Sequence, residues 1–595
     1  MEKRTLLAIV LSLMVILIYQ YLFVPEPSKP PLKEQKVSEE THKSQDKSSH
    51  SGIISEAKDY PVGQEIVKLL EEQKKEKPKD IAIETEKYKA VINTDGARIV
   101  SWKLKNYFLT DDHENVPWKM VFWNRVGNSY KSYFSRLIGS KTYIQEKRDN
   151  IDLFQASDLD KAHCLQLMIG NSIKEDDGMA GQNTFNGVFH TQGGNVVLDS
   201  EHPKETIKFS YITSNGFQVE KSLTFYNDTY QFDVEVLTKN LKEFKDTMDY
   251  SILLGPGLGN SFQKGAHKYE GPLSWLDGKK IKYKPGKNAS DIQHQGNVAW
   301  TAMTSNYFFA AAIPQKEESE VLISRPASVA KDGPSINQLT TIGLHYPARE
   351  IASGGFEKDS YKFYFGPKQY KVLEKAGIHL EQVVDYGFFS ILAKPLIWLL
   401  NWFYQWMPNY GIAIILLTIL IKIVFWPLTD KSFRSMKQMQ DMQPKLAGLR
   451  EKHKGDPKKL NEELMGMYKE KGINPMGGCL PLLLQIPVFF ALYEGLMVAI
   501  ELRAAPFMFW ITDLSVMDPL LITPILMGIT MYAQQKMTPM AGDATQVKMM
   551  MMMPLVFTVF FLGFPSGLVI YWLLNNILTV GQHYLILKKM NAVTL

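Results

Sequence analysis

The apolar segment Gly411–Pro427 constrains the fold of this chain most strongly, because it reads GIAIILLTILIKIVFWP and suits a membrane-spanning helix. Its only strongly polar side chains are Thr418 and Lys422. A cation inside such a helix costs about 2.5–3.5 kcal/mol, so it usually faces a hydrated cavity or a partner. Lys422 lies five residues before Pro427, however, and its stem could also reach the nearer membrane interface. On this segment alone, both interpretations stay open.

Further apolar runs predict additional spans. Leu6–Val24 follows Lys3 and Arg4 and shows no small-residue cleavage site, which predicts an uncleaved anchor. Residues 25–80 are rich in Pro, Lys, Glu and Ser, a composition that predicts a flexible tether. Four more candidate spans follow Lys422, at about 479–499, 520–536, 549–563 and 567–587.

The charges of the loops predict the orientation of these spans. Residues 430–475 contain eleven Lys and Arg residues, whereas the loop 501–519 contains only Arg503. The positive-inside rule therefore places both termini and 430–475 in the cytoplasm, with six spans in total. A seventh span at Asp385–Met407 would break this pattern. Lys394-Pro395 interrupts that segment and its tryptophans recur at helical spacing, so we expect an interfacial helix on the outer surface.

The region from about 81 to 370 has a different periodicity. Tyr230, Phe232, Val234 and Val236 alternate with polar residues, as in a strand with one buried face. Several such strands with polar connections predict one large antiparallel β-sandwich. Because this region follows the anchor, we expect it outside the cytoplasm.

The late spans each carry one polar stripe. In 567–587, Trp572, Asn575, Thr579 and Gln582 recur at helical spacing and so lie on one face. In 479–499 the polar residue on the corresponding face is the amide Gln485. Such stripes commonly serve interhelical hydrogen bonding, which is the alternative here. Four striped helices together with a deep cation favour a shared hydrated groove. The residues that we expect in this groove are Thr418, Lys422, Gln485, Phe489, Thr530, Gln534, Trp572, Asn575, Thr579 and Gln582.

Several function classes lack their usual residues. An ion-coupled carrier would need deep carboxylates, but the only acid inside these spans is Glu494, close to an outer end. The chain contains no P-loop, HExxH or GxSxG motif, and Cys164 and Cys479 form no metal spacing. We therefore expect neither an enzyme nor a metal or cofactor, and the net charge of +5 favours no specific nucleic-acid recognition.

The basic segment 430–475 is predicted to form two helices joined at 454–457, with the second starting at Asp456-Pro457. One interpretation is a docking surface for emerging chains, a ribosome or anionic lipids. The residues that we expect to dock are Met436, Met439, Lys445, Arg450 and Lys454. The alternative is a solvated helical hairpin whose apolar residues form a seam of their own.

Six stretches of this chain resemble the membrane protein insertase family that includes bacterial YidC and its mitochondrial and chloroplast relatives. They include YGIAIILLTILIKIVFWPLT (410–429), NPMGGCLPLLLQIPVFFALY (474–493) and FTVFFLGFPSGLVIYWLLNN (557–576), with 383–396, 501–515 and 518–537. The resemblance covers essentially the whole chain. The anchor followed by a large β domain is similar to the Gram-negative form of the family.

The resemblance implies a polytopic α-helical membrane protein with six spans, a five-helix insertase core and a periplasmic antiparallel β-supersandwich. It also implies a groove open to the cytoplasm and to lipid, and action alone or with the Sec translocon. Lys422 stands where the bacterial pattern usually has arginine, so a rigid fork of donors is missing. The expected parts are an anchor (1–24), a tether (25–80), the periplasmic domain (81–375), an interfacial helix (383–407), a second span (408–428), a cytoplasmic hairpin (429–475), four more spans (476–587) and a short tail (588–595).

Two other functions remain as alternatives. A small-solute transporter or channel would also have several spans, but this chain lacks inverted repeats and coupling acids. A sugar-binding or sugar-modifying domain on an anchor would suit the β-sandwich, but no paired carboxylates stand in a compelling context there.

Overall fold

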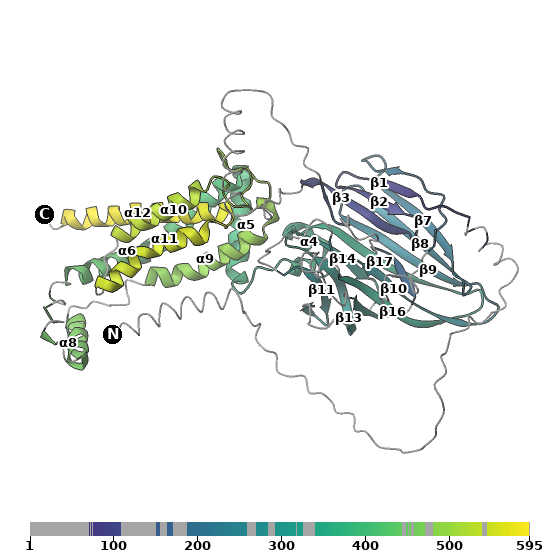
Figure 1. Ribbon diagram of the computed structural model, residues 1–595, viewed down its shortest axis with the longest axis horizontal. Helices are drawn as coiled ribbons and strands as arrows, with labels where there is room; N and C mark the ends of the chain where they lie inside the picture. The colour runs from purple at the N-terminus through teal and green to yellow at the C-terminus, as the bar shows by residue number, and fades with distance from the viewer. Residues whose placement is uncertain are drawn as a thin grey trace, which may run out of the picture. The chain divides into compact units, whose positions relative to one another are not determined.

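The computed structural model describes a β-rich region followed by a helical region, and most of their elements are labelled in Figure 1. The described residues are 71, 73, 75–108, 150–154, 164–169, 187–258, 269–283, 292–316, 318–324, 340–442, 445, 448–449, 452–453, 457–470, 480–537 and 544–593. The predicted anchor and nearly all of the predicted tether lie outside these residues.

The β-rich region runs from β1 to β17. In chain order its described strands are β1 (Asp80–Glu84), β2 (Tyr88–Asn93), β3 (Arg98–Phe108), β4 (Asn150–Asp152), β5 (Leu167–Ile169), β6 (Val196–Val197), β7 (Lys204–Ile212), β8 (Phe217–Tyr226), β9 (Gln231–Asn240), β10 (Asp246–Leu254), β11 (Gly271–Leu276), β12 (Lys279–Lys282), β13 (Ile292–Thr304), β14 (Phe308–Pro314), β15 (Glu318–Ser324), β16 (Thr341–Ile351) and β17 (Phe356–Pro367).

These strands form two sheets. The smaller has the order β4-β3-β2-β1-β6, and the larger has the order β5-β10-β16-β15-β13-β14-β17-β9-β8-β7, with the β11–β12 hairpin paired to β13. β8 and β9 pair antiparallel in a register that places Phe225 opposite Phe232 and Leu223 opposite Val234. All four of these side chains are buried. The alternation predicted from the sequence is therefore confirmed in this hairpin.

A cluster of aromatic side chains joins the two sheets. Trp102 of β3 stacks on Tyr88 of β2 with ring centroids 3.9 Å apart. Its other neighbours are Phe232 of β9, at 5.2 Å, and Phe365 of β17, at 5.1 Å, both in the larger sheet. Aromatic pairs at these separations contribute beyond the area that they bury. The two sheets thus share one core, as a sandwich requires.

One pairing differs from the antiparallel prediction, since β6 pairs parallel with β1 through Ile83 and Val196. A short hairpin turn forces antiparallel pairing, but a long connection leaves either direction possible. More than a hundred residues separate these two strands, so nothing local sets their direction.

The helical region follows α4 (Tyr370–Ala376) and the 3₁₀ turn η3 (Leu380–Val383). In chain order its described elements are α5 (Ser390–Trp406), α6 (Tyr410–Asp441), α8 (Pro457–Glu470), α9 (Leu480–Val498), the 3₁₀ turn η4 (Ile500–Leu502), α10 (Ile522–Met537), α11 (Ala544–Phe561) and α12 (Ser566–Val593). Among the described residues, the segment Tyr410–Met439 is the one helix long and apolar enough to cross a membrane, and 485–498 and 550–561 are shorter apolar helices.

Two prolines that were expected near helix breaks lie inside helices. The expected interfacial helix 383–407 is shorter in the structure: Val383 lies in η3, and α5 runs from Ser390 to Trp406, through Pro395. α6 likewise continues through Pro427 into the expected hairpin and ends at Asp441. An interior proline removes one backbone hydrogen bond, but ending a helix leaves several backbone groups unsatisfied, which costs more where water is scarce.

α5 has the two-sided character expected of an interfacial helix. Ala393, Ile397 and Leu400 are buried, whereas Trp398 and Trp406 are 59% and 73% exposed. The buried face packs against α9 and α6. A helix with one packed face and a row of exposed tryptophans suits a membrane interface.

Close contacts hold the remaining helices together. α12 packs against α10 and α6, and α10 also packs against α11. At Gly528 of α10, an added Cβ would lie 1.9 Å from Thr558 Oγ1 of α11. At Gly495 of α9, it would lie 2.8 Å from Ile397 Cδ1 of α5. Small residues at such positions allow membrane helices to approach closely.

Candidate functional site

Lys422 meets a hydroxyl group on another helix. Its Nζ donates a hydrogen bond of 2.8 Å to Thr579 Oγ1 of α12. The Thr579 hydroxyl in turn donates to the carbonyl oxygen of Asn575, at 2.6 Å. Lys422 lies twelve residues into α6, or about 18 Å along the helix. The structure therefore gives Lys422 a hydroxyl partner on a second helix, α12.

The polar side chains of α12 are turned into the protein. Asn575 and Thr579 are each 7% exposed, and together with Lys422 they form what we call the polar layer. Asn576, which the sequence analysis did not select, is also buried and donates to the carbonyl of Met527 on α10 at 3.4 Å. Two adjacent asparagines in an apolar helix were the sequence feature from which a role for Asn576 could have been predicted. Asn575 is part of the polar layer, whereas Asn576 forms a hydrogen bond with α10.

Gln582 lies one turn beyond the polar layer, toward the end of α12. Its side chain is 3% exposed, and neither amide atom has a hydrogen-bond partner among the described residues. Buried polar groups in proteins almost always have a partner, either protein or water. The amide of Gln582 is therefore suited to bind a water molecule or a polar group of a ligand.

A stacked pair follows directly after Gln582. The ring of His583 lies on the ring of Phe433 of α6, with centroids 4.3 Å apart and an angle of 9°. Phe433, Met436 and Ile586 form a small buried cluster beside it. These contacts join the C-terminal halves of α6 and α12. Phe433 and His583 are not among the residues predicted from the sequence, and nothing in the local pattern pairs them.

Two predicted groove residues, Phe489 and Trp572, meet in an aromatic layer. The rings of Phe489 on α9 and Trp572 on α12 are 4.6 Å apart, and Phe561 and Phe557 of α11 lie at 5.2 and 6.2 Å from Trp572. We call these four residues the aromatic layer. Trp572 precedes Thr579 by seven residues, or about 10 Å. The aromatic layer therefore lies nearer the start of α12 than the polar layer does.

The other predicted groove residues occupy the surrounding helices. Thr418 is buried and donates to the Ile414 carbonyl of its own helix, at 2.6 Å. Thr530 likewise donates within α10, to the carbonyl of Met527, at 2.9 Å. Gln485 and Gln534 are half-buried on α9 and α10. Among the described residues, the hydrogen bond of Lys422 goes to Thr579 and not to these amides.

The predicted docking residues have different environments. Met436 packs into the cluster with Phe433 and Ile586, and Met439 packs with Met442 and residues of α8, namely Leu464, Met467 and Tyr468. The packing of Met439 and Met442 beside α8 agrees with the alternative of a hairpin whose apolar residues form a seam of their own, whereas Met436 packs beside Ile586 of α12. Lys445 is exposed, and Arg450 and Lys454 lie outside the described residues.

Comparisons with known proteins match both regions of the chain. A family described as the 60Kd inner membrane protein matches residues 402–593, and one described as the YidC periplasmic domain matches residues 140–399. The membrane protein insertase YidC of Syntrophus aciditrophicus is 37% identical over 99% of this chain and 100% of its own length. That of Maridesulfovibrio salexigens is 35% identical over 99% of each chain.

A crystal structure of an active YidC insertase with its first transmembrane domain resolved covers 84% of this chain and 92% of its own. Its TM-score is 0.33 at 15% identity.

The matches define an inner membrane protein with a periplasmic β-sandwich domain. The chain belongs to the YidC family of membrane protein insertases, which confirms the family predicted from the sequence motifs. Members of this family are insertases and not enzymes.

Proposed function

We propose that this protein inserts inner-membrane proteins into the bilayer and helps them to fold, using a hydrated cationic groove open to the cytoplasm and to lipid. Its substrates are nascent membrane proteins. The observation that carries this proposal is the hydrogen bond between Lys422 and Thr579, with buried polar side chains on both sides along α12. The topology proposed below would place this bond near the middle of the bilayer. A cation held at that depth lowers the cost of bringing a polar segment into the membrane.

The polar layer and the aromatic layer together suit a groove that a substrate enters from the cytoplasmic side and that is closed on the outer side. A substrate's polar flank would enter past Gln582, whose amide atoms have no partner among the described residues, and reach the polar layer. Water and the ammonium of Lys422 would solvate that flank while the adjacent apolar segment moves sideways into lipid. The aromatic layer lies beyond the polar layer and would limit leakage to the outer side. Since Lys422 is a point charge, this mechanism needs no bidentate pairing with a carboxylate.

The proposed topology has six spans: the anchor, α6, α9, α10, α11 and α12. Both termini and the basic hairpin would lie in the cytoplasm, and α5 would lie on the outer surface through its exposed tryptophans. Support comes from the charge of residues 430–475 and from the two-sided burial of α5. The domain boundaries proposed from the sequence follow the same order.

The proposed partners act at the cytoplasmic side and in the bilayer. The basic hairpin would contact ribosomes and anionic lipids through exposed lysines such as Lys445. Because Met436 and Met439 pack within the protein, we assign this contact to the cations. The protein would act alone or with the Sec translocon.

Reconstitution of the purified protein in liposomes tests the proposal. A small single-span substrate should become protease-protected only in liposomes that contain the protein. Flux of small solutes without protection of the substrate would instead indicate a transporter. A photoreactive side chain in place of Gln582 should capture the polar flank of the substrate. The same group in place of the exposed Ile577 on α12 is the matched control and should not capture that flank.

A further inference from the structure

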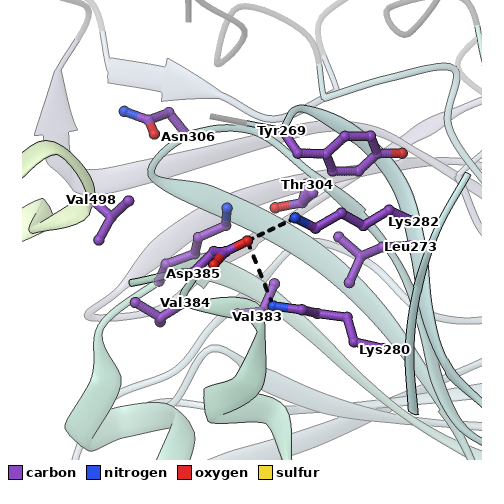
Figure 2. A pocket seen from close by; sticks show the side chains of 11 residues that line it. Tyr269, Leu273, Lys280, Lys282, Thr304, Asn306, Val383, Val384, Asp385 and Val498 are labelled. Atoms are coloured by element: carbon purple, nitrogen blue, oxygen red, sulfur yellow. Dashed lines mark hydrogen bonds and ion pairs between the residues drawn. The ribbon is translucent and has the colours of Figure 1, made fainter. Parts of the chain in front are cut away.

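A small cavity lies where the β domain, the segment before α5 and the end of α9 meet. It measures about 20 Å³ and is lined on one side by Val383, Val384 and Val498. Lys280, Lys282 and Asp385 also line it (Figure 2). A third lysine of the lining is Lys368. We call these four charged residues and Asn306 the junction cluster. The cavity is large enough for about one water molecule, so its charged groups chiefly face one another.

Asp385 forms ion pairs with two lysines of the β11–β12 hairpin. Its Oδ2 lies 2.7 Å from Lys282 Nζ and 3.8 Å from Lys280 Nζ, and both lysines belong to β12 (Figure 2). Lys280 Nζ also donates to the carbonyl of Gln382, at 3.0 Å. Burial by itself would raise the pKa of the Asp385 carboxyl, but attraction to Lys280 and Lys282 outweighs it and holds this pKa well below its usual range.

The same segment also touches α9. Asp385 Oδ1 accepts a hydrogen bond of 3.0 Å from the backbone N–H of Gly387. Gly387 has a φ of 66°, and an added Cβ there would lie 2.8 Å from Glu494 Cδ of α9. The chain therefore passes between the β12 lysines and α9 at a point where no side chain fits.

A second contact reaches α9 directly from the β domain. Asn306, between β13 and β14, is buried and donates through Nδ2 to the carbonyl of Met497 at 3.2 Å, in the last turn of α9. Its own backbone N–H donates to Glu270, at 2.8 Å. Lys368, also buried, donates to the neighbouring Ser305 carbonyl. The end of α9 thus contacts the β domain, while Phe489, about two turns along α9, contacts Trp572.

We propose that Asp385 is a positioning residue that fastens the end of α9 to the periplasmic β domain through Lys280 and Lys282. The ion pairs hold residues 383–389 between the β11–β12 hairpin and α9, and the bond from Asn306 completes the attachment. This keeps α9 in the position that brings Phe489 onto Trp572, which are part of the aromatic layer. The consequence for insertion rests on the proposed function, whereas the attachment itself does not.

Hydrogen–deuterium exchange of the full-length protein in detergent or lipid tests the attachment without any insertion assay. In Asp385→Asn, which keeps the side-chain shape but removes its charge, we expect amides of 383–390 and 494–502 to exchange about ten-fold faster. Lys282→Gln should act in the same direction. Lys279→Ala is the matched control, because Lys279 is the exposed first residue of β12 and lies outside the junction cluster. The double variant Asp385→Lys with Lys282→Asp should recover at least part of the protection.

The outcomes separate the attachment from the proposed function. Unchanged exchange in both Asp385→Asn and Lys282→Gln would overturn the proposal. Faster exchange in 383–390 alone would also overturn it, because Asp385 would then secure its own segment and not α9. An equal effect of Lys279→Ala would show that overall charge on the hairpin is responsible, and not the ion pairs. If exchange responds as expected while the wild-type protein inserts no substrate in liposomes, the attachment stands and the proposed function fails.

Discussion

Replacement of Lys422 by methionine should impair insertion without destabilising the protein. Methionine keeps an unbranched side chain of similar length but removes the charge. Its effect therefore separates the role of the cation in the groove from its role in the fold. Lys422→Arg keeps the charge and should keep most of the activity, since the bond to Thr579 needs one donor.

The expected cost to the fold is small. The charge-assisted bond to Thr579 contributes about 1.5–3 kcal/mol, and placing a lysine at this depth costs about 2.5–3.5 kcal/mol. These contributions nearly cancel, so we expect the free energy of unfolding to change by less than about 1 kcal/mol. The Thr579 hydroxyl retains its own acceptor, the Asn575 carbonyl, and no buried donor is left unpaired by the change.

The expected cost to insertion is larger. An ammonium about 6 Å from a substrate carboxylate, at an effective dielectric constant of about 40, contributes about 1.4 kcal/mol, which is about ten-fold in rate. Initial insertion rates of a substrate with an acidic flank in liposomes measure this, with thermal unfolding of each variant in parallel. Ile423→Met is the matched control, because Ile423 is adjacent on α6 and 63% exposed.

Two results would refute this reasoning. Equal insertion rates for Lys422→Met, Ile423→Met and the wild type would show that the cation is dispensable. A fall in the unfolding midpoint of Lys422→Met as large as that of a core truncation would show that the lysine serves the fold. In that case, a lower insertion rate would say nothing about the groove.

Three further predictions concern stability. Gly528→Val should destabilise the helical region by about 1–3 kcal/mol, because its Cβ would lie 1.9 Å from Thr558 Oγ1. Gly581→Ala, with nothing within 4 Å of its Cβ, should be neutral or slightly stabilising in the same thermal melts. Trp102→Ala should cost the β domain about 3–5 kcal/mol in denaturant unfolding, since Trp102 joins both sheets, and a loss under 1 kcal/mol would contradict that role. Burial lowers the pKa of Lys221 to about 7, so the unfolded chain binds more protons between pH 7 and about 10, and stability should rise with pH across this window. The unfolding midpoint of the wild type, relative to that of Lys221→Met, should therefore rise between pH 7 and 9. A difference between the two midpoints that stays constant with pH would contradict the prediction.

Short-range periodicity predicted much of the architecture. The alternation of Phe232, Val234 and Val236 with polar residues marks the buried face of β9, because successive side chains of a strand point to opposite faces. The apolar runs predicted the ends of α9, α10, α11 and α12 to within two residues, except that α11 starts five residues earlier and α12 ends six residues later than expected. These features depend on neighbours along the chain, which a single sequence displays.

Local signals were misleading where the surroundings outweighed them. Pro395 and Pro427 normally weaken a helix, yet α5 and α6 continue through both. The methionines of the basic hairpin were compatible with an open surface or with a seam. Their packing against α8 and α12 depends on a fold-back that no local pattern specifies.

The sequence by itself determined which segments must leave water, where the cations lie along the chain and to which family the chain belongs. Burial of apolar surface and the cost of an unpaired charge act on composition and spacing, so these conclusions can be read along the chain. Only the tertiary structure decided which polar atoms meet: Lys422 with Thr579, 157 residues away, and Lys282 with Asp385, 103 residues away. A hydrogen bond or an ion pair requires two atoms within a few ångströms in space, and separation along the chain does not specify that distance.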